Sequence, residues 1–165
     1  MLFRSCENET LRNQNHRSER YRSRSLPIPF GAGIHSQRDT GNLEETPKIL
    51  QVKGNPIQLQ QVILNLVVNS MDAMASLPNG RVVTGRTELC NGTSAEISIS
   101  DSGHGIPSEQ LARVFDPFFT TKEQGMGIGL SIARTIVQAH SGRIWAENQT
   151  GGGAIFRLSI PLAKA

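Results

Sequence analysis

The stretch IQLQQVILNLVVNSMDAMASL (57–77) decides the main helix of the fold. Its apolar side chains recur every three or four residues, which is the spacing of one buried stripe on an α-helix. Pro56 directly precedes the stretch, and a proline is tolerated there because the first turn of a helix needs no N–H donor. The sequence LPNG (77–80) then supplies residues that end a helix. We therefore predict a long amphipathic helix over residues 57–77.

Two asparagines lie beside the apolar stripe of this predicted helix. Asn65 and Asn69 are four residues apart, so they lie one turn above the other, and Asp72 follows three residues later. Because their neighbours are apolar, an unpaired amide at these positions would be costly. Each amide could simply bracket a neighbouring stretch of backbone. Two amides in register also suit a polar ligand that needs carbonyl oxygens, such as hydrated Mg²⁺ with phosphates.

The segment DSGHGIP (101–107) is a predicted turn that directly follows a predicted strand, SAEISIS (94–100). An Asn-Gly pair at 91–92 joins that strand to RVVTGRTELC (81–90) in a predicted hairpin. The carboxylate of Asp101, fixed at a strand end, can accept a hydrogen bond from an exocyclic amino group, and glycines let a planar base approach the backbone. The same pattern also occurs as a plain tight turn, so by itself it is a weak indication.

The segment GMGIGLS (125–131) places three glycines at the start of a predicted helix over residues 128–140. Backbone N–H groups at a helix start, together with its positive dipole end, form a phosphate site. The glycine spacing matches neither a Walker loop nor a dinucleotide fingerprint. Just before it, Thr120, Thr121 and Lys122 offer two hydroxyl groups and a cation to phosphates.

The remaining segments complete an α/β pattern. We predict a short strand over KILQV (48–52), a short helix that begins at Ser108 and a loop over residues 115–127. RIWAEN (143–148) and AIFRLSIPL (154–162) read as a final pair of strands joined by a glycine turn. Helices mixed with two hairpin-like pairs indicate a two-layer α/β sandwich, with helices on one face of a single mixed, mostly antiparallel sheet.

Residues 1–45 differ in composition from the rest of the chain. They are rich in Arg, Ser, Asn and Gln, and seven arginines against four acids give residues 1–40 a formal charge of +3. A basic tail could contact nucleic acid or an anionic surface. This one has no aromatic interleaving beyond Tyr21 and no recognition fold, so we expect an irregular basic N-terminal segment over residues 1–45, no nucleic-acid partner, and one domain over residues 46–165.

The 165-residue chain has no apolar run of the roughly 18 residues that cross a bilayer, and its first residues lack the apolar stretch of a signal peptide. A hydrophobic fraction of 37% suits one globular domain with its own core. We therefore expect no membrane span in this chain and a cytoplasmic location.

Four segments, in this order, resemble the signature boxes of sensor histidine kinases. QLQQVILNLVVNSMDAM (58–74) resembles their N box, DSGHGIP (101–107) their first glycine box, and FDPFF (115–119) their F box. GMGIGLSIARTIVQAHSGRIWAEN (125–148) is similar to their second glycine box with the helix and strand after it. The resemblance extends over about residues 47–162 and is strongest to the nitrogen- and oxygen-regulation type. It implies the Bergerat ATP-binding fold of gyrase B, the ninety-kilodalton heat-shock chaperones and mismatch-repair ATPases, with a flexible ATP lid.

The resemblance also implies which residues hold ATP and Mg²⁺. Asn69 would supply the Mg²⁺-binding carbonyl, Asp101 would accept from the adenine amino group, and Phe115, Phe118 and Phe119 would anchor the lid. The implied catalytic residues are Asn65, Asn69 and Lys122. The implied ATP-binding residues are Asn65, Asn69, Asp72, Asp101, Gly103, Gly105, Ile106, Phe115, Phe119, Thr120, Thr121, Lys122, Gly125, Gly127, Ile128, Gly129 and Leu130.

Position 65 separates the relatives that share this fold. The hydrolytic members carry Glu there, whereas Asn65 cannot act as a general base at neutral pH. A site without its own base suits transfer to a neutral histidine imidazole, which is already a nucleophile. The resemblance therefore implies the ATP-binding catalytic domain of a two-component sensor histidine kinase, a protein histidine kinase that donates the γ-phosphate of ATP to a histidine.

None of the four histidines resembles the phosphoacceptor motif of the family, which has an acidic residue after the histidine and a nearby proline. We therefore assign no phosphoacceptor and expect structural or exposed roles for His16, His35, His104 and His140. The acceptor is expected on a dimerisation domain, in cis upstream or in trans, with relay to the receiver domain of a response regulator. Two alternatives stay open: a nucleotide-binding interaction module without kinase activity, and a Bergerat-fold ATPase, which Asn65 disfavours.

Overall fold

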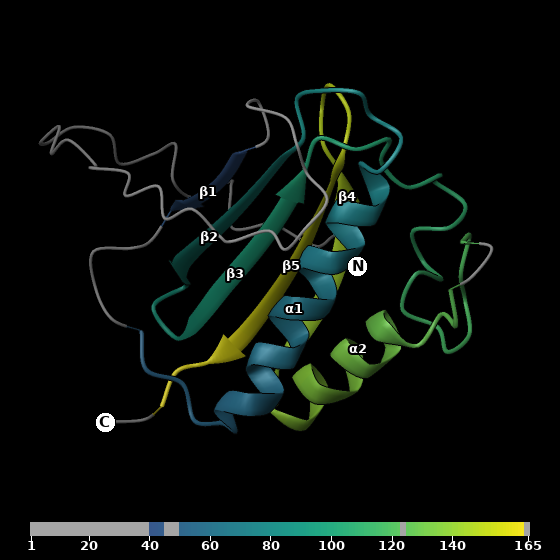
Figure 1. Ribbon diagram of the computed structural model, residues 1–165. Coiled ribbons are helices and arrows are strands. Elements are labelled where there is room, and N and C mark those ends of the chain that lie inside the picture. The colour runs from purple at the N-terminus through teal and green to yellow at the C-terminus, as the bar shows by residue number, and fades with distance from the viewer. Residues whose placement is uncertain (1–39, 45–49, 123–124, 164–165) are drawn as a thin grey trace, which may run out of the picture.

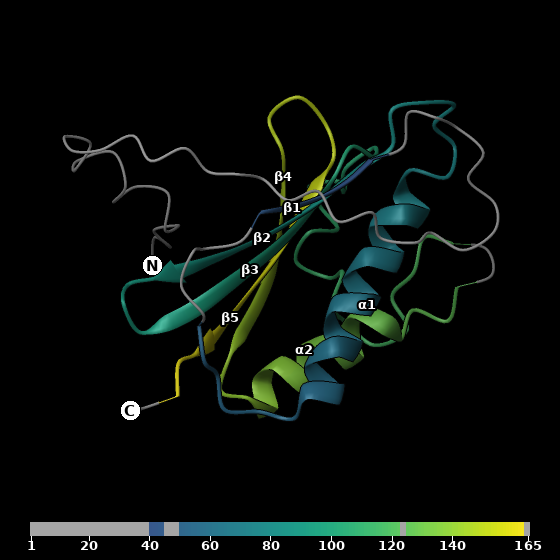
Figure 2. The same ribbon diagram turned by 60° about the vertical axis from the view of Figure 1, so that its left-hand side comes forward.

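The computed structural model describes residues 40–44, 50–122 and 125–163. Two helices lie side by side against one face of a five-stranded sheet, as Figures 1 and 2 show from two directions. Along the chain the elements are β1 (Thr40–Glu44), α1 (Pro56–Ala73), β2 (Val82–Cys90), β3 (Ser94–Asp101), α2 (Gly129–Ala139), β4 (Arg143–Asn148) and β5 (Ala154–Pro161). The predicted two-layer α/β sandwich is confirmed.

The strands follow the order β1-β2-β3-β5-β4 across the sheet. β1 pairs with β2 in parallel, and the other three pairings are antiparallel, so the sheet is mixed and mostly antiparallel, as predicted. The alternation of side chains puts Ile99 of β3 and its cross-strand partner Phe156 of β5 into the core between sheet and helices.

β1 lies in the segment for which the sequence predicted irregular structure up to residue 45. The structure differs from that prediction at residues 40–44, because Thr40 pairs with Val82 and Glu44 with Arg86. Residues 1–39 and 45–49 lie outside the described residues, so the rest of the prediction for the N-terminal segment stays a prediction. Of the strand predicted over residues 48–52, the described part forms one isolated bridge, between Val52 and Leu162.

Helix α1 begins as its sequence predicts. The side chain of Asn55 accepts hydrogen bonds from the main-chain N–H groups of Ile57 (3.0 Å) and Gln58 (3.3 Å), which caps the first turn, and Pro56 occupies the first helical position. The helix ends at Ala73, four residues earlier than predicted, and the chain then continues in turns with three backbone hydrogen bonds of the i→i+3 kind. The Arg81 guanidinium donates to the Leu77 carbonyl (2.8 Å), which stabilises this early end.

Both predicted hairpins are present, and backbone geometry explains their turns. Asn91 and Gly92 have φ of 51° and 68°, the left-handed pair that an Asn-Gly hairpin requires. The helix predicted from Ser108 is absent. Residues 107–116 instead form consecutive turns, with Gln110 N–H donating to Pro107 O and Arg113 N–H to Gln110 O, both at 2.8 Å. One bond, from Val114 N–H to Gln110 O (3.0 Å), has the α-helical i→i+4 spacing, but it stands beside i→i+3 bonds and no regular helix forms, so the prediction was wrong there.

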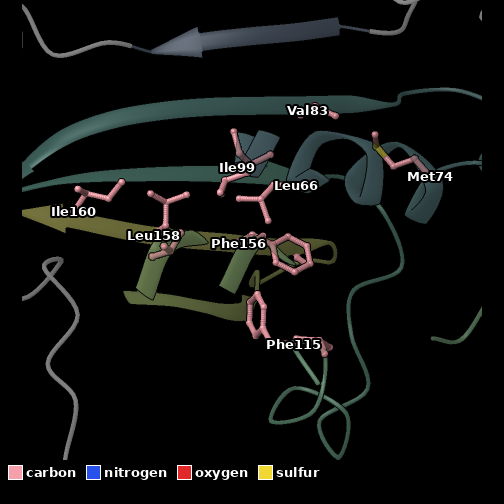
Figure 3. Close-up of a cluster of buried hydrophobic side chains, with 13 residues drawn as sticks. Leu66, Met74, Val83, Ile99, Phe115, Phe156, Leu158 and Ile160 are labelled. Carbon is pink, nitrogen blue, oxygen red and sulfur yellow. The ribbon is translucent and has the colours of Figure 1, made fainter. Parts of the chain in front are cut away.

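The core lies between the sheet and the two helices (Figure 3). Leu66 of α1 and Leu158 of β5 are almost fully buried, and each such leucine contributes about 1.5–3 kcal/mol by leaving water. Phe115, from the segment between the layers, packs edge-on against Phe156 of β5 with ring centroids 6.3 Å apart. That contact fixes the start of the segment that leads into the predicted lid. No helix in the described part of the chain is both long and apolar enough to cross a membrane.

Candidate nucleotide-binding site

The side-chain amides of the two asparagines of α1 donate hydrogen bonds to backbone carbonyl oxygens. Asn65 Nδ2 donates to the carbonyl of Gly129 at the start of α2 (2.9 Å), and Asn69 Nδ2 donates to the carbonyl of Asn65 (2.7 Å). The bracketing role that the sequence left open is therefore present for both. Because its N–H group is held by its own helix, Asn69 presents its side-chain carbonyl oxygen away from α1.

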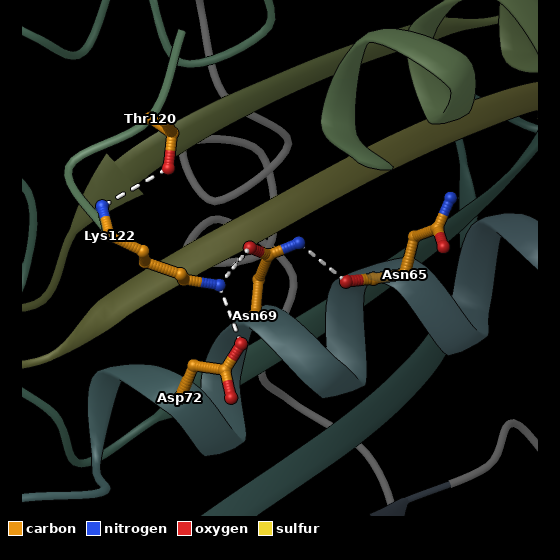
Figure 4. A network of polar contacts seen from close by, with 5 residues as sticks. All are labelled: Asn65, Asn69, Asp72, Thr120 and Lys122. Atoms are coloured by element: carbon orange, nitrogen blue, oxygen red, sulfur yellow. Dashed lines mark hydrogen bonds and ion pairs between the residues drawn. The ribbon is translucent and has the colours of Figure 1, made fainter. Parts of the chain in front are cut away.

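Lys122 meets that carbonyl oxygen. Its ammonium donates to Asn69 Oδ1 (3.1 Å) and to Asp72 Oδ2 (2.5 Å). Figure 4 shows the Lys122 side chain reaching from the segment before α2 to the Asn69 and Asp72 side chains on α1. The charged side chains are about half exposed, so this ion pair adds little stability in water. An amide oxygen and a carboxylate thus lie on one face of α1, where the Lys122 ammonium contacts both of them, and such groups suit the predicted phosphate and metal chemistry.

The segment before α2 turns tightly around two glycines. A Cβ on Gly125 would lie 2.7 Å from Thr120 Oγ1, and one on Gly127 would lie 2.6 Å from the Phe119 carbonyl oxygen. Gly127 also has φ of 64°, which disfavours other residues, and its carbonyl accepts from Phe118 N–H (3.0 Å). The Thr120 hydroxyl accepts from Lys122 N–H (3.1 Å), which holds the backbone from which the Lys122 side chain extends.

Thr121 is exposed, and its side chain makes no hydrogen bond within the residues that the structure describes. The place that the resemblance gives Thr121 at the phosphates therefore stays a prediction. Residues 123 and 124 of the predicted lid lie outside the described residues. The flexibility of the lid remains a prediction.

The three phenylalanines of the predicted lid anchor differ. Phe115 is buried, and Phe119 packs partly buried against the core with the Arg113 guanidinium 5.0 Å from its ring centroid. Phe118 has φ of 62° and leaves 77% of its surface exposed. The structure therefore does not pack Phe118 into the core with Phe115 and Phe119, and its role as an anchor of the lid stays a prediction.

Helix α2 starts next to the asparagines. A Cβ on Gly129 would lie 3.8 Å from Asn65 Cγ and 3.9 Å from Asn69 Nδ2, which places this helix start over the polar face of α1. Its N-cap residue, Ile128, supplies no side-chain hydrogen bond to the first turn. N–H groups at an uncapped helix start can bind an anion, and the helix dipole favours negative charge there. Ile128 is half-buried, and Leu130 packs against the core.

Asp101, the last residue of β3, combines burial with an unused oxygen. Asp101 is only 2% exposed, and its Oδ1 accepts hydrogen bonds from Gly103 N–H (2.9 Å) and Ala154 N–H (3.3 Å). Oδ2 is buried and has no hydrogen-bond partner among the described residues. Leaving a buried polar atom unpaired costs free energy, which a bound donor recovers. An exocyclic amino group, such as that of adenine, fits this requirement.

The glycines after Asp101 are required by close approach. A Cβ on Gly103 would lie 2.8 Å from Asp101 Oδ1 and 2.9 Å from the Ala73 carbonyl oxygen. Gly105 has φ of 75°, and a Cβ there would lie 3.0 Å from Asn148 Oδ1. The next residue, Ile106, packs partly buried against the core. The Asp101–Ile106 loop therefore lies directly on α1 and on the end of β4.

Three residues at this site were missed by the sequence analysis. Asn148 Oδ1 accepts from Ile106 N–H (2.8 Å) and Asn148 Nδ2 donates to Ile106 O (2.6 Å). Gln149 Nε2 donates to Asp101 O (2.7 Å), and a Cβ on Gly153 would collide with that same carbonyl. From the sequence these residues were assigned only to a strand end and a glycine turn. Two amides directly before that turn were the one signal that could have found them.

The two described histidines serve the backbone. His104 Nδ1 lies 2.7 Å from the Gly105 carbonyl oxygen, and both ring nitrogens of His140 have main-chain partners, Asn55 and Ile136. This arrangement agrees with the structural roles expected for them. His16 and His35 lie outside the described residues.

These features define the class of the protein: an α/β domain with a buried, unpaired carboxylate oxygen at the end of β3 and a polar face of α1 that carries amide, carboxylate and ammonium groups. The family model for histidine kinase-, DNA gyrase B- and HSP90-like ATPases matches residues 54–164, and the chain belongs to this family.

Sensor kinases are prominent among its relatives. The chain is 42% identical over 132 residues to the sensor protein FixL of Bradyrhizobium diazoefficiens, an alignment that covers 80% of this chain and 26% of FixL. The catalytic domain of histidine kinase ThkA superposes with a TM-score of 0.64 at 37% identity, over 72% of this chain and 76% of that domain. A structure of ThkA in complex with response regulator protein TrrA matches with a TM-score of 0.60 at 33% identity, over 73% of this chain and 33% of that one.

The described unit is therefore the ATP-binding catalytic domain of the sensor histidine kinase type, which is part of the kinase catalytic unit. The chain spans about a quarter of the length of FixL.

Proposed function

We propose that this chain binds Mg–ATP and transfers the γ-phosphate to a histidine on a dimerisation domain, for relay to the receiver domain of a response regulator. The supporting observation is the absence of a free base on the phosphate-facing side of α1 in the described structure. Asn65 is an amide bonded to Gly129, and Asp72, the one carboxylate of α1, is paired with Lys122 here and would be held by Mg²⁺ once the nucleotide is bound. Hydrolysis needs a base to activate water, whereas a neutral imidazole attacks without one.

The base of ATP would be recognised at the end of β3. Asp101 Oδ2, the buried oxygen without a partner, would accept a hydrogen bond from the adenine amino group. Gly103 and Gly105 would let the planar ring approach the backbone, because a side chain at either position would meet Asp101, Ala73 or Asn148.

The phosphates would lie between α1 and the start of α2. Lys122 would exchange its present partners, Asn69 and Asp72, for phosphate oxygens. The first turn of α2, whose N–H groups have no side-chain cap, would accept a phosphate on its positive end. Phosphoryl transfer depends mainly on positioning and charge neutralisation, and these groups would supply both.

The chemistry of the oxygen donors on α1 suits Mg²⁺. Asn69 Oδ1 and the Asp72 carboxylate are hard oxygen ligands on one face, and Mg²⁺ typically takes one or two such ligands together with phosphates and waters. The described residues contain no cluster of three or more His, Cys, Asp or Glu side chains, so a closed protein cage is not available there. When bound, Mg²⁺ would neutralise charge on the transferring phosphates.

The test is a transfer assay. The purified chain is incubated with γ-labelled ATP and Mg²⁺, with and without the histidine-bearing dimerisation domain of a related sensor kinase. We expect an acid-labile, alkali-stable label on the added domain, and none with Asn69→Ala as the matched control. Label on the added domain that is acid-stable, or no label, would contradict the proposal.

A second candidate is a nucleotide-binding interaction module that docks to a partner kinase or a response regulator. It is favoured by the two described histidines, His104 and His140, whose rings are engaged with the backbone and are therefore poor phosphoacceptors. In the same assay, ATP binding without transfer would support this candidate, and free phosphate without any phosphoprotein would support an ATPase. For either role we propose a cytoplasmic location, where ATP and response regulators are found.

A further inference from the structure

We propose that Asn148 and Gln149, between β4 and the glycine turn, are positioning residues for adenine recognition. They hold the Asp101–Ile106 loop in the conformation in which Asp101 faces the base. This inference rests on the proposed binding of ATP, but it concerns two residues to which the family resemblance assigned no role.

Asn148 binds the loop in the way that a neighbouring strand would. Its side chain satisfies both main-chain polar groups of one residue, accepting from Ile106 N–H (2.8 Å) and donating to Ile106 O (2.6 Å). Asn148 is itself exposed, so it fills no space in the core. Its contribution to the protein is therefore concentrated in these two hydrogen bonds, which connect the end of β4 to a loop 42 residues away in sequence.

The residues after Asn148 hold Asp101 itself. Gln149 Nε2 donates to the Asp101 carbonyl (2.7 Å), and the Ala154 N–H donates to Asp101 Oδ1 (3.3 Å). Gly153 packs so closely on the Asp101 carbonyl that no side chain fits at that position. Main-chain and side-chain atoms of Asp101 are thus both held by one turn, which sets the direction of Oδ2.

The proposal therefore assigns different roles to the residues that contact the base and to those that position them. Asp101 would contact the base, whereas Asn148 and Gln149 would act on the base through Asp101 and Ile106. Loss of Asn148 releases both polar groups of Ile106 to water and lets the loop sample other conformations, which lowers the fraction of molecules ready to bind. The energetic effect should depend on whether the nucleotide carries the amino group that Asp101 accepts from.

The experiment compares two nucleotides on the full chain. Affinities for Mg–ATP and for Mg–purine riboside triphosphate, which lacks the amino group, are measured by titration calorimetry. We expect wild type to prefer ATP, so that the dissociation constant for the purine riboside triphosphate exceeds that for ATP. In Asn148→Ala, ATP binding should weaken about tenfold, and the dissociation constant for the purine riboside triphosphate divided by that for ATP should fall at least about threefold. Thr150→Ala, an exposed change in the same turn, is the matched control and should leave both affinities unchanged.

Further measurements keep the test decisive. Gln149→Leu, which keeps the size but removes the donor to Asp101, should lower the same ratio. Hydrogen exchange of the Ile106 amide without nucleotide should accelerate at least about tenfold in Asn148→Ala, because the bond to Asn148 Oδ1 is lost. Wild type that binds no ATP overturns the proposed function and this inference together. Wild type that prefers ATP, with an unchanged ratio in Asn148→Ala and Gln149→Leu, overturns this inference alone.

Discussion

His140 Nε2 accepts a hydrogen bond from the main-chain N–H of Asn55 (3.0 Å), which joins the end of α2 to the cap of α1. An N–H group can donate only to a ring nitrogen without a proton, so the Nδ1 proton donates to the Ile136 carbonyl (2.7 Å). A neutral ring thus connects the two helices at the ends remote from the Asn65–Gly129 contact. Gly54 is required beside it, because a Cβ there would collide with the His140 ring.

The first prediction concerns this link. His140→Ala should lower the free energy of unfolding by about 1–3 kcal/mol, because two hydrogen bonds are lost and the Asn55 N–H is left without its acceptor. Urea denaturation followed by circular dichroism measures the change. The control is Gln138→Ala, at an exposed position of α2 two residues before His140, and it should change stability by less than about 0.5 kcal/mol. Equal effects of the two changes would contradict the role of His140.

The second prediction concerns the base. Asp101→Asn should weaken Mg–ATP binding about tenfold, because the amide can still accept but loses the charge-assisted bond to the amino group. Titration calorimetry measures the affinity, and thermal unfolding shows whether the fold survives. Asp116→Asn, which changes a half-exposed carboxylate that pairs with Arg113 and Arg134, should leave the affinity unchanged. An Asp101→Asn protein that binds ATP as tightly as wild type would remove the assignment of Asp101.

The third prediction uses a buried hydroxyl in α1. Ser70 is fully buried, and its Oγ has no hydrogen-bond partner among the described residues. Ser70→Ala should therefore raise the free energy of unfolding by about 1 kcal/mol, because the desolvated hydroxyl is removed. Ser131→Ala is the matched opposite, since Ser131 Oγ donates to Ile128 O (2.8 Å), and it should lower stability. The idea fails if Ser70→Ala destabilises the protein as Ser131→Ala does.

The fourth prediction concerns pH. Burial raises the pKa of Glu96 above its ordinary value of 4.5, although the hydrogen bond from Arg157 (3.0 Å) opposes the shift. The folded protein therefore holds the Glu96 proton more tightly than the unfolded chain does. Its contribution to stability is present below about pH 4.5, declines as pH rises through the raised pKa, and is constant above it.

The measurement is urea denaturation of wild type and Glu96→Gln between pH 4 and 8. The difference in stability, wild type minus variant, should fall as pH rises across this window. The exposed Glu109→Gln is the control and should give a difference that does not fall. A wild type that gains stability relative to Glu96→Gln as pH rises would show that the pKa is depressed instead.

Short sequence patterns were sufficient to predict the elements whose structure is determined by residues close together in the sequence. The amphipathic period of α1, the Asn-Gly turn at 91–92 and the glycine turn before Ala154 each determine structure within a few residues, and all three are present. β1 is different, because Thr40–Glu44 is a strand only through parallel pairing with β2, about 40 residues away, and its own sequence carries no strong β pattern.

The site divides in the same way. The positions of Asn65, Asn69 and Asp72 follow from helical spacing, and the position of Asp101 from the end of a strand. The bonds of Asn148 to Ile106 depend on how β4 and the Asp101–Ile106 loop meet across the sheet, which no short pattern encodes. The exposure of Phe118 was likewise not foreseen, because the F-box sequence does not reveal the positive φ at this residue.

The shared position of Lys122 has an electrostatic consequence. Because its ammonium already lies on Asp72 and Asn69, a phosphate that recruits Lys122 exchanges one ion pair for another and adds none. When the phosphate binds Lys122, it releases counter-ions, but the Asp72 carboxylate that Lys122 leaves attracts counter-ions in turn. The two effects partly cancel unless a metal ion binds Asp72. Nucleotide affinity in this domain should therefore depend on ionic strength less steeply than the number of charges at the site suggests. The dependence should become steeper when enough Mg²⁺ is present to bind Asp72.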